Sequence, residues 1–200
     1  MQSAVIHCAA MSNTSLPSPI HLRCAVHALQ AGQVIAYPTE AVWGLGCDPF
    51  DEGAVRQVLE LKQRSEAKGL IIIAADIAQI EPWLEALDEV QKQAVRATWP
   101  GPYTWIVPAP RAPRWLRGEH ASLAVRVSAH PGVQALCRAW GGPLVSTSAN
   151  RSGHPPVPTP LALRREFGDG LGYILPGTLG GDAKPSEIRD AVTGVVLRAR

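Results

Sequence analysis

Lys62 and Arg64 are two cationic residues whose types and spacing suit the binding of an anion. On a helix they would point to nearly opposite sides, but they share one face if the helix ends at Lys62 and the chain then extends. A lysine beside an arginine presents a point charge and a planar fork to one phosphate. Lys68 follows as a third cation. The alternative is that all three are solvated surface charges.

Small polar residues form a second candidate site. Ser146, Thr147, Ser148 and Asn150 come directly after the apolar stretch at 143–145. Hydroxyls and free backbone N–H groups at the carboxyl end of a strand suit the binding of phosphate or carboxylate. An ordinary Ser/Thr turn is the alternative.

A third candidate is Arg126, inside the predicted strand 122–127. The period of two places it on the face of Ser122 and opposite to the neighbouring valines, so that it would line a cleft. A structural salt bridge is the alternative interpretation.

Two loops carry further polar residues. Thr39 and Glu40 follow the predicted strand 34–37, at the end where α/β proteins bind ligands. The Gly-Leu-Gly at 44–46 is half of a dinucleotide fingerprint or, alternatively, an ordinary turn. The segment 184–190 contains Ser186 and is predicted to be a loop, either a lid over a ligand or plain surface.

The elements that must position these residues alternate between helix and strand. Helical patterns are predicted around 22–29, 51–62, 76–99, 133–140 and 161–167, and strands at 34–37, 70–74, 103–107, 122–127, 143–145, 173–175 and 195–198. Alternation of this kind, with extra adjacent strands late in the chain, indicates one α/β domain with a mixed sheet. We expect residues 19–200 to form this domain and residues 1–18 to be a flexible N-terminal tail.

Composition excludes several classes of protein. The 200 residues are 46% hydrophobic with a net charge of +2, which favours a folded protein and gives no general argument for a nucleic-acid partner. The four cysteines favour reduced thiols in a cytoplasmic protein, with disulfides or a metal as the alternatives. No apolar run reaches the about 20 residues that span a membrane. The four cysteines and six histidines lack the spacing of a metal site, so no bound metal is expected. Phosphate-loop, HExxH and GxSxG motifs are absent.

Five segments together resemble one family. In chain order they are YPTEAVWGLGCD, Lys62-Gln63-Arg64, SLAVRV, PLVSTSAN and PSEIRD. They resemble the YrdC-type family, and within it the compact threonylcarbamoyl-AMP synthases, from about Ile20 to Arg198. This resemblance implies a single YrdC-like α/β domain, with a twisted mixed β-sheet flanked by helices and a concave basic cleft.

The resemblance also implies an activity. A nucleotidyltransferase of this kind joins ATP, L-threonine and bicarbonate into threonylcarbamoyl-adenylate and releases pyrophosphate. Partner proteins then transfer the threonylcarbamoyl group to the adenosine beside the anticodon of tRNA. No tightly bound cofactor is expected, and Mg²⁺ would accompany ATP.

The same resemblance assigns residues to ligands. It implies ATP contacts and catalytic roles for Lys62, Arg64, Ser148 and Asn150, further nucleotide contacts for Ser122 and Arg198, and threonine contacts for Thr39, Arg126, Ser146 and Ser186. Ser65 stands where the family often has proline, which suggests a less rigid junction after Arg64. Ile73 stands where longer relatives have a histidine, so no role is assigned to it.

The rival prediction is a non-catalytic module of the same fold that binds double-stranded RNA or tRNA. Its basis is a basic loop with one aromatic residue, made of Arg111, Arg114, Trp115 and Arg117.

Overall fold

The computed structural model describes residues 16–182 and 184–200. Its α-helices are α1 (Pro19–Gln30), α2 (Glu52–Lys62), α3 (Glu81–Leu84), α4 (Glu89–Arg96), α5 (Arg114–Arg117), α6 (Pro131–Trp140) and α7 (Pro160–Phe167). Its strands are β1 (Ile35–Pro38), β2 (Trp43–Gly46), β3 (Ile71–Ala74), β4 (Tyr103–Pro108), β5 (Ser122–Val127), β6 (Leu144–Ser148), β7 (Tyr173–Ile174), β8 (Glu187–Asp190) and β9 (Val196–Arg198). Short 3-10 turns lie at Glu66–Lys68, Ile77–Gln79 and Gly168–Gly170.

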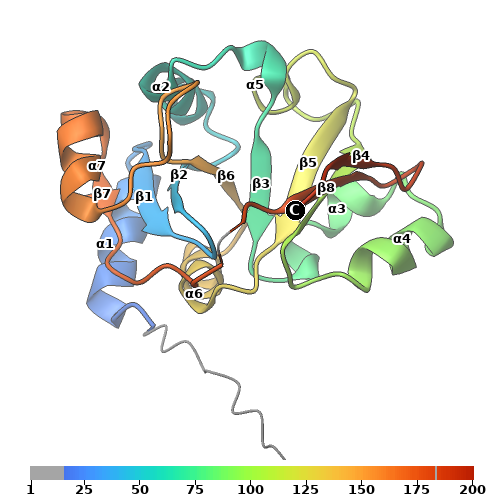
Figure 1. Ribbon diagram of the computed structural model, residues 1–200, viewed down its shortest axis with the longest axis horizontal. Coiled ribbons are helices and arrows are strands. Elements are labelled where there is room, and N and C mark those ends of the chain that lie inside the picture. The colour runs from blue at the N-terminus through green and yellow to red at the C-terminus, as the bar shows by residue number, and fades with distance from the viewer. Residues whose placement is uncertain (1–15, 183) are drawn as a thin grey trace, which may run out of the picture.

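Within these residues nine strands form one mixed sheet in the order β7-β1-β2-β6-β3-β5-β4-β8-β9 (Figure 1). Strand β3 is parallel to β5 and antiparallel to β6, and β4 is antiparallel to β5 and parallel to β8. The predicted α/β domain with a mixed sheet is therefore confirmed.

Helices cover the two faces of the sheet unequally. On one face, α2, α3, α4, α5 and α7 bury side chains such as Val58 and Leu163 against Ile72 and Val125. On the other face, a smaller cluster joins α1 and α6 to β1 and to Leu144 of β6. The central strands extend beyond this second cluster, so part of that face stays free of helices. This uncovered part is where a ligand can approach the sheet.

The predicted helix starts follow from capping. Asp51 accepts a hydrogen bond from the Ala54 N–H at 3.1 Å and begins α2. Ser18 caps α1, and Pro17 before it is buried. The predicted tail at 1–18 is therefore too long at its end, because Pro17 and Ser18 belong to the fold. Residues 1–15 lie outside the described residues, and their flexibility stays a prediction.

The helical pattern at 76–99 is interrupted near Pro82 as predicted, because Pro82 lacks the N–H that a continuous helix needs and lies in the first turn of α3. A second break follows, where a capping box at Asp88 begins α4.

Three strand assignments differ from the sequence prediction. Residues 43–46 form β2 rather than a turn, and 187–190 form β8 at the flank of β4 rather than a loop. Strand β6 continues to Ser148, so Ser146, Thr147 and Ser148 pair with β3 and β2 and do not follow the strand as a turn. The predicted cluster of free backbone N–H groups at these residues was therefore wrong.

Gly46 explains why β2 has so little strand character in the sequence. A Cβ at this position would lie 2.3 Å from the Val145 carbonyl oxygen and 2.8 Å from the Tyr37 ring. The Tyr37 hydroxyl donates to the same carbonyl at 3.2 Å, which fixes the ring over the glycine. The glycine therefore serves the close packing of a strand against a buried ring, and the dinucleotide-fingerprint alternative has no support here.

Gly46→Ala should destabilise the fold by about 1–3 kcal/mol, because backbone and a buried ring must both move to admit the methyl group. Urea unfolding measures the loss. Gly53→Ala inside α2 is the matched control, where the nearest atom is 3.3 Å from the added Cβ and alanine favours the helix. Equal stability of the two variants would contradict the packing argument.

Candidate functional site

The uncovered part of the sheet forms the floor of a cleft of about 590 Å³. Its floor consists of alternate residues of the central strands, for example Ile71 and Ile73 of β3 and Ser122 and Arg126 of β5. The intervening residues, such as Val125, point into the core on the other face. The prediction that Arg126 lines a cleft together with Ser122 is confirmed.

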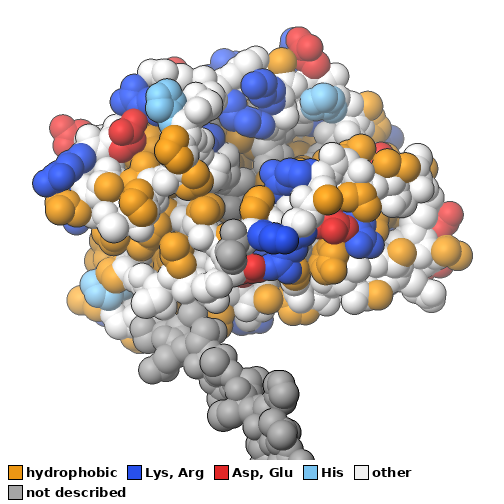
Figure 2. All heavy atoms as spheres, in the orientation of Figure 1, with side chains coloured by type: hydrophobic (Ala, Val, Ile, Leu, Met, Phe, Trp, Pro, Cys, Tyr) orange, Lys and Arg blue, Asp and Glu red, His pale blue; other side chains and the backbone are white. Residues whose placement is uncertain are grey.

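Cations outnumber carboxylates in the lining. The charged lining residues are Arg64, Lys68, Arg117, Arg126, Lys184 and Arg198 against Glu40, Asp182 and Asp190. Figure 2 shows Lys and Arg side chains gathered around the hollow in the middle of this face. The excess of positive charge suits an anionic ligand.

Five of the six cations fall into two groups along the strands. Arg64, Lys68 and Arg117 lie in segments that lead into the amino ends of β3 and β5, whereas Arg126 lies near the carboxyl end of β5 and has Arg198 as a neighbour. Ser122 and Arg126 are four residues apart, which corresponds to roughly 13 Å along a strand. The cleft is therefore long enough to hold two anionic groups at separate positions.

Eight of the ten predicted site residues line this one cleft. They are Thr39, Arg64, Ser122, Arg126, Ser146, Ser148, Ser186 and Arg198. Lys62 and Asn150 do not belong to its lining. Lys62 and Asn150 therefore lie outside the cleft lining to which the other eight residues belong.

Lys62 lies outside the cleft lining, and its ammonium group is hydrogen bonded to the segment after β6. Its side chain is 2% exposed, and its ammonium group donates to the Ser148 carbonyl and to the backbone and side-chain oxygens of Asn150 at 2.5, 2.9 and 3.4 Å. Ser148 in turn donates to the same Asn150 side-chain oxygen at 2.5 Å. Lys62 therefore fixes the turn after β6 and, through it, the direction of the Ser148 hydroxyl.

Arg64 points elsewhere because Gln63 is left-handed. Gln63 has φ 50°, and the N–H groups of Gln63 and Arg64 bind the carbonyls of Glu60 and Leu59, which closes the end of α2. The helix ends at Lys62 as predicted, but the predicted extended chain with both cations on one face was wrong. Arg64 lines the cleft and donates to the Gly69 carbonyl at 3.0 Å, and burial lowers its pKa.

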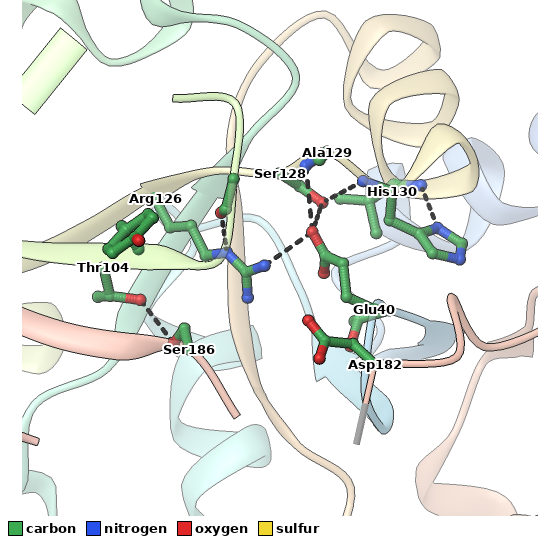
Figure 3. A network of polar contacts seen from close by, with 12 residues as sticks. Glu40, Thr104, Arg126, Ser128, Ala129, His130, Asp182 and Ser186 are labelled. Carbon is green, nitrogen blue, oxygen red and sulfur yellow. Dashed lines mark hydrogen bonds and ion pairs between the residues drawn. The ribbon is translucent and has the colours of Figure 1, made fainter. Parts of the chain in front are cut away.

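At the other end, Arg126 is 11% exposed and forms an ion pair with Glu40 at 2.7 Å (Figure 3). Burial lowers the pKa of Arg126, whereas the nearby Glu40 raises it. Sequence reasoning placed Glu40 at a ligand-binding edge but gave it no role. The signal was its position directly after a strand and beside Thr39.

A chain of hydroxyls and one arginine forms the side of the cleft near β8. Ser186 and Thr104 hydrogen bond through their hydroxyls at 2.9 Å, and Arg198 donates to the Ser186 carbonyl at 2.7 Å. Burial lowers the pKa of Arg198, and the neighbouring Arg126 lowers it further. Thr104 was missed because it lies in a strand with no polar motif around it.

Metal-ligating clusters of three or more His, Cys, Asp or Glu side chains do not occur within residues 16–182 and 184–200. Glu40 forms an ion pair with Arg126, and the Asp190 carboxylate accepts hydrogen bonds from the N–H groups of Val192 and Thr193. Among the same residues, no helix is both long and apolar enough to cross a membrane.

The free energy of unfolding should depend on pH because of the buried ammonium group of Lys62. Burial, followed by the nearby Arg64, lowers the pKa of Lys62 from 10.5 to about 8. Between these two values the unfolded chain holds a proton that the folded chain has released, so stability rises with pH there. Relative to Lys62→Met, the wild type should gain about 1–3 kcal/mol between pH 7.5 and 10.

Urea unfolding of both proteins at the two pH values measures this gain. The other groups that titrate in this range, such as the thiol of Cys137, whose pKa burial raises to about 12, are common to both proteins and cancel. A stability difference that is the same at both pH values would refute a lowered pKa of Lys62.

Comparison with known proteins adds to this geometry. A family model described as telomere recombination, covering Sua5, YciO and YrdC proteins, matches residues 27–199. The chain is 59% identical over 186 residues to a threonylcarbamoyl-AMP synthase of Stenotrophomonas maltophilia, which spans 89% of this chain and 97% of that protein. It is 57% identical over 175 residues to the threonylcarbamoyl-AMP synthase of Chromohalobacter salexigens, with 87% and 94% covered.

Solved structures share the fold. YciO of E. coli superposes with a TM-score of 0.78 at 25% identity, covering 92% of this chain and 91% of that one. Sua5 of P. abyssi in complex with L-threonine gives a TM-score of 0.77 at 32% identity, covering 84% of this chain but only 50% of the longer Sua5 chain. With the family match over most of its length and relatives at this identity, the chain belongs to the Sua5/YciO/YrdC family.

Proposed function

We propose that this protein is a threonylcarbamoyl-AMP synthase, a nucleotidyltransferase that forms L-threonylcarbamoyl-adenylate and pyrophosphate from ATP, L-threonine and bicarbonate. The observation that supports this most strongly is the pair of cation groups at opposite ends of one cleft. A reaction between two anions needs both held at once, close together and in line. Relatives at 52–59% identity carry the name of this enzyme.

The chemistry fits a cleft without a catalytic dyad. The amine of threonine condenses with bicarbonate, the bond from the bicarbonate carbon to its hydroxyl breaks, and water leaves, which gives a carbamate whose oxygen carries negative charge. This oxygen attacks the α-phosphorus of ATP, the bond from that phosphorus to the bridging β-oxygen breaks, and pyrophosphate leaves with the electron pair. No base has to remove a proton in this step, so the demands on the protein are position and charge stabilisation.

The residues divide between these demands. Arg64, with Lys68 beside it, is suited to the phosphates, and Ser148 and Ser122 add hydroxyl donors nearby. Arg126, Thr39, Ser146 and Ser186 are suited to the carboxylate and hydroxyl of threonine. Lys62 and Asn150 hold the turn that orients Ser148, and their direct contacts with ATP stay a prediction.

The proposed reaction also implies a metal ion that accompanies ATP, a use for the product and a location in the cell. Mg²⁺ would accompany ATP and neutralise charge on the phosphates, and no lining carboxylate is assigned to it, because Asp182 is paired with Arg200 and Asp190 accepts from backbone N–H groups. The adenylate product is consumed by proteins that modify the adenosine beside the anticodon of tRNA. A cytoplasmic location agrees with this use and stays a prediction.

The RNA-binding alternative is less well supported by its own loop. Trp115 is partly buried, and its indole N–H donates to the Pro49 carbonyl at 3.2 Å. Arg117 donates to the carbonyls of Ala112 and His120 at 3.0 and 2.6 Å. One aromatic ring and one arginine of the predicted RNA surface are thus held by the fold, and a stacking platform requires the ring to be free.

Pyrophosphate release from ATP should require both L-threonine and bicarbonate, because the nucleophile is the carbamate made from them. A coupled pyrophosphate assay with each substrate left out in turn measures this. Release that is indifferent to threonine would rule out the synthase. Tight tRNA binding that weakens steeply with salt, without turnover, would favour the RNA module instead.

Lys62→Ala should lower kcat at least 100-fold, because the turn that carries Ser148 loses the ammonium group that fixes it. The KM for threonine should change much less, since Arg126 lies at the other end of the cleft. Arg138→Ala, on the exposed side of α6, is the matched control and should behave as wild type. A rise in the threonine KM without loss of kcat would contradict the positioning role.

A further inference from the structure

Glu40 stands out among the cleft residues that the proposed chemistry does not use. It lies in the turn between β1 and β2, and its side chain is 14% exposed. One of its carboxylate oxygens, Oε1, lies 2.7 Å from Arg126 Nη2, 2.8 Å from the Ser128 hydroxyl and 3.1 Å from the Ala129 nitrogen (Figure 3). Three donors from the end of β5 thus converge on a single oxygen of a residue 86 or more positions away.

The arginine is held at two points. Its Nε donates to the Gly101 carbonyl at 3.1 Å, and its Nη2 pairs with Glu40. A planar guanidinium fixed at both positions has a fixed orientation, and it keeps further N–H donors for a ligand out of its total of five. Figure 3 shows the two side chains facing each other, one from β5 and one from the turn after β1.

Opposite charges strengthen the contact between Arg126 and Glu40. An arginine that is 11% exposed loses most of its hydration, so a facing carboxylate at 2.7 Å must compensate for it. The charged groups around Arg126 are Glu40 and Asp182, which favour its cationic form, and Arg198 and Arg200, which oppose it. Asp182 is itself paired with Arg200, which leaves Glu40 as the direct partner.

The other oxygen of Glu40 argues against a purely structural role. Oε2 is buried and has no hydrogen-bond partner among residues 16–182 and 184–200. A buried carboxylate oxygen without a donor lowers stability, and such groups are found where function requires them. The fold thus retains a carboxylate that is bound through Oε1 alone, the oxygen that faces Arg126.

We infer that Glu40 is a positioning residue for the amino-acid substrate: it sets the guanidinium of Arg126 in the plane that receives the substrate carboxylate. This inference rests on the proposed function, since it assigns the Arg126 end of the cleft to threonine. Glu40 acts through Arg126 and does not itself enter the reaction.

Steady-state kinetics of Glu40→Gln, which keeps the shape of the side chain and removes its charge, test the inference. The KM for L-threonine should rise at least tenfold, while the KM for ATP stays within about twofold. A loss of folded protein alone would lower the apparent kcat and leave both KM values unchanged. Glu166→Gln is the matched control, because Glu166 is also paired with an arginine, Arg151 at 2.6 Å, but on the exposed surface.

A double-mutant cycle decides whether Glu40 works through Arg126. Arg126→Ala should raise the threonine KM, and Glu40→Gln added to it should raise the KM no further. Independent effects that multiply in the double variant would overturn the inference. An unchanged threonine KM in Glu40→Gln would overturn it as well.

A readout without turnover separates this inference from the proposed function. In isotope-labelled wild type, the ion pair should slow rotation of the Arg126 Nη2 group and give a resolved NMR signal that Glu40→Gln abolishes. Persistence of that signal in the variant would overturn the positioning role. If the wild type releases no threonine-dependent pyrophosphate, the synthase proposal fails, while loss of the signal still supports the role of Glu40 at Arg126.

Discussion

The alternation of side chains along β3, β5 and β6 is the constraint on which the rest of the structure depends. Ile72 and Val125 face a core closed by helices, while Ile73, Arg126 and Ser146 face the other way. The alternation is regular in these three strands, because successive side chains of a strand point to opposite faces. One set of strands therefore builds a full hydrophobic core on one side and a polar floor on the other, provided that helices leave part of that second side uncovered.

Two largely buried cations serve this floor, Arg126 within it and Lys62 outside its lining, and they are stabilised in different ways. Lys62 is surrounded by neutral oxygens of the turn after β6, so its charge is spread over hydrogen bonds and no carboxylate is needed. Arg126 has a carboxylate opposite it and keeps part of its hydrogen-bonding capacity. The first arrangement fixes backbone, and the second leaves donors free for a ligand. This difference explains why a lysine suits the first place and an arginine the second.

The sequence predicted most of the fold from local patterns. The capped start of α2, its end at Lys62, and the strands around Ile72 and Val125 all followed from short-range chemistry. Strands β2 and β8 did not, because their glycines and charges carry no strand signal. Gly46 belongs to a strand because a tyrosine ring and a carbonyl leave no room for a larger residue. Residues 187–190 form a strand because the edge of β4 is available to pair with them.

The residues of the candidate site, like the strands, were predicted only in part from the sequence. The sequence by itself determined which residue types are present and, through the period of two, that Arg126 and Ser122 share one face of a strand. The resemblance of five motifs to a known family implied that Ser146 and Ser186 serve the same site. Only the tertiary structure decided that Gln63 turns Arg64 into the cleft and leaves Lys62 outside its lining, and that Glu40 meets Arg126. The reason is that the ion pair joins segments 86 residues apart, which no local pattern encodes, and that the left-handed cap falls on Gln63, a residue type that rarely adopts this conformation.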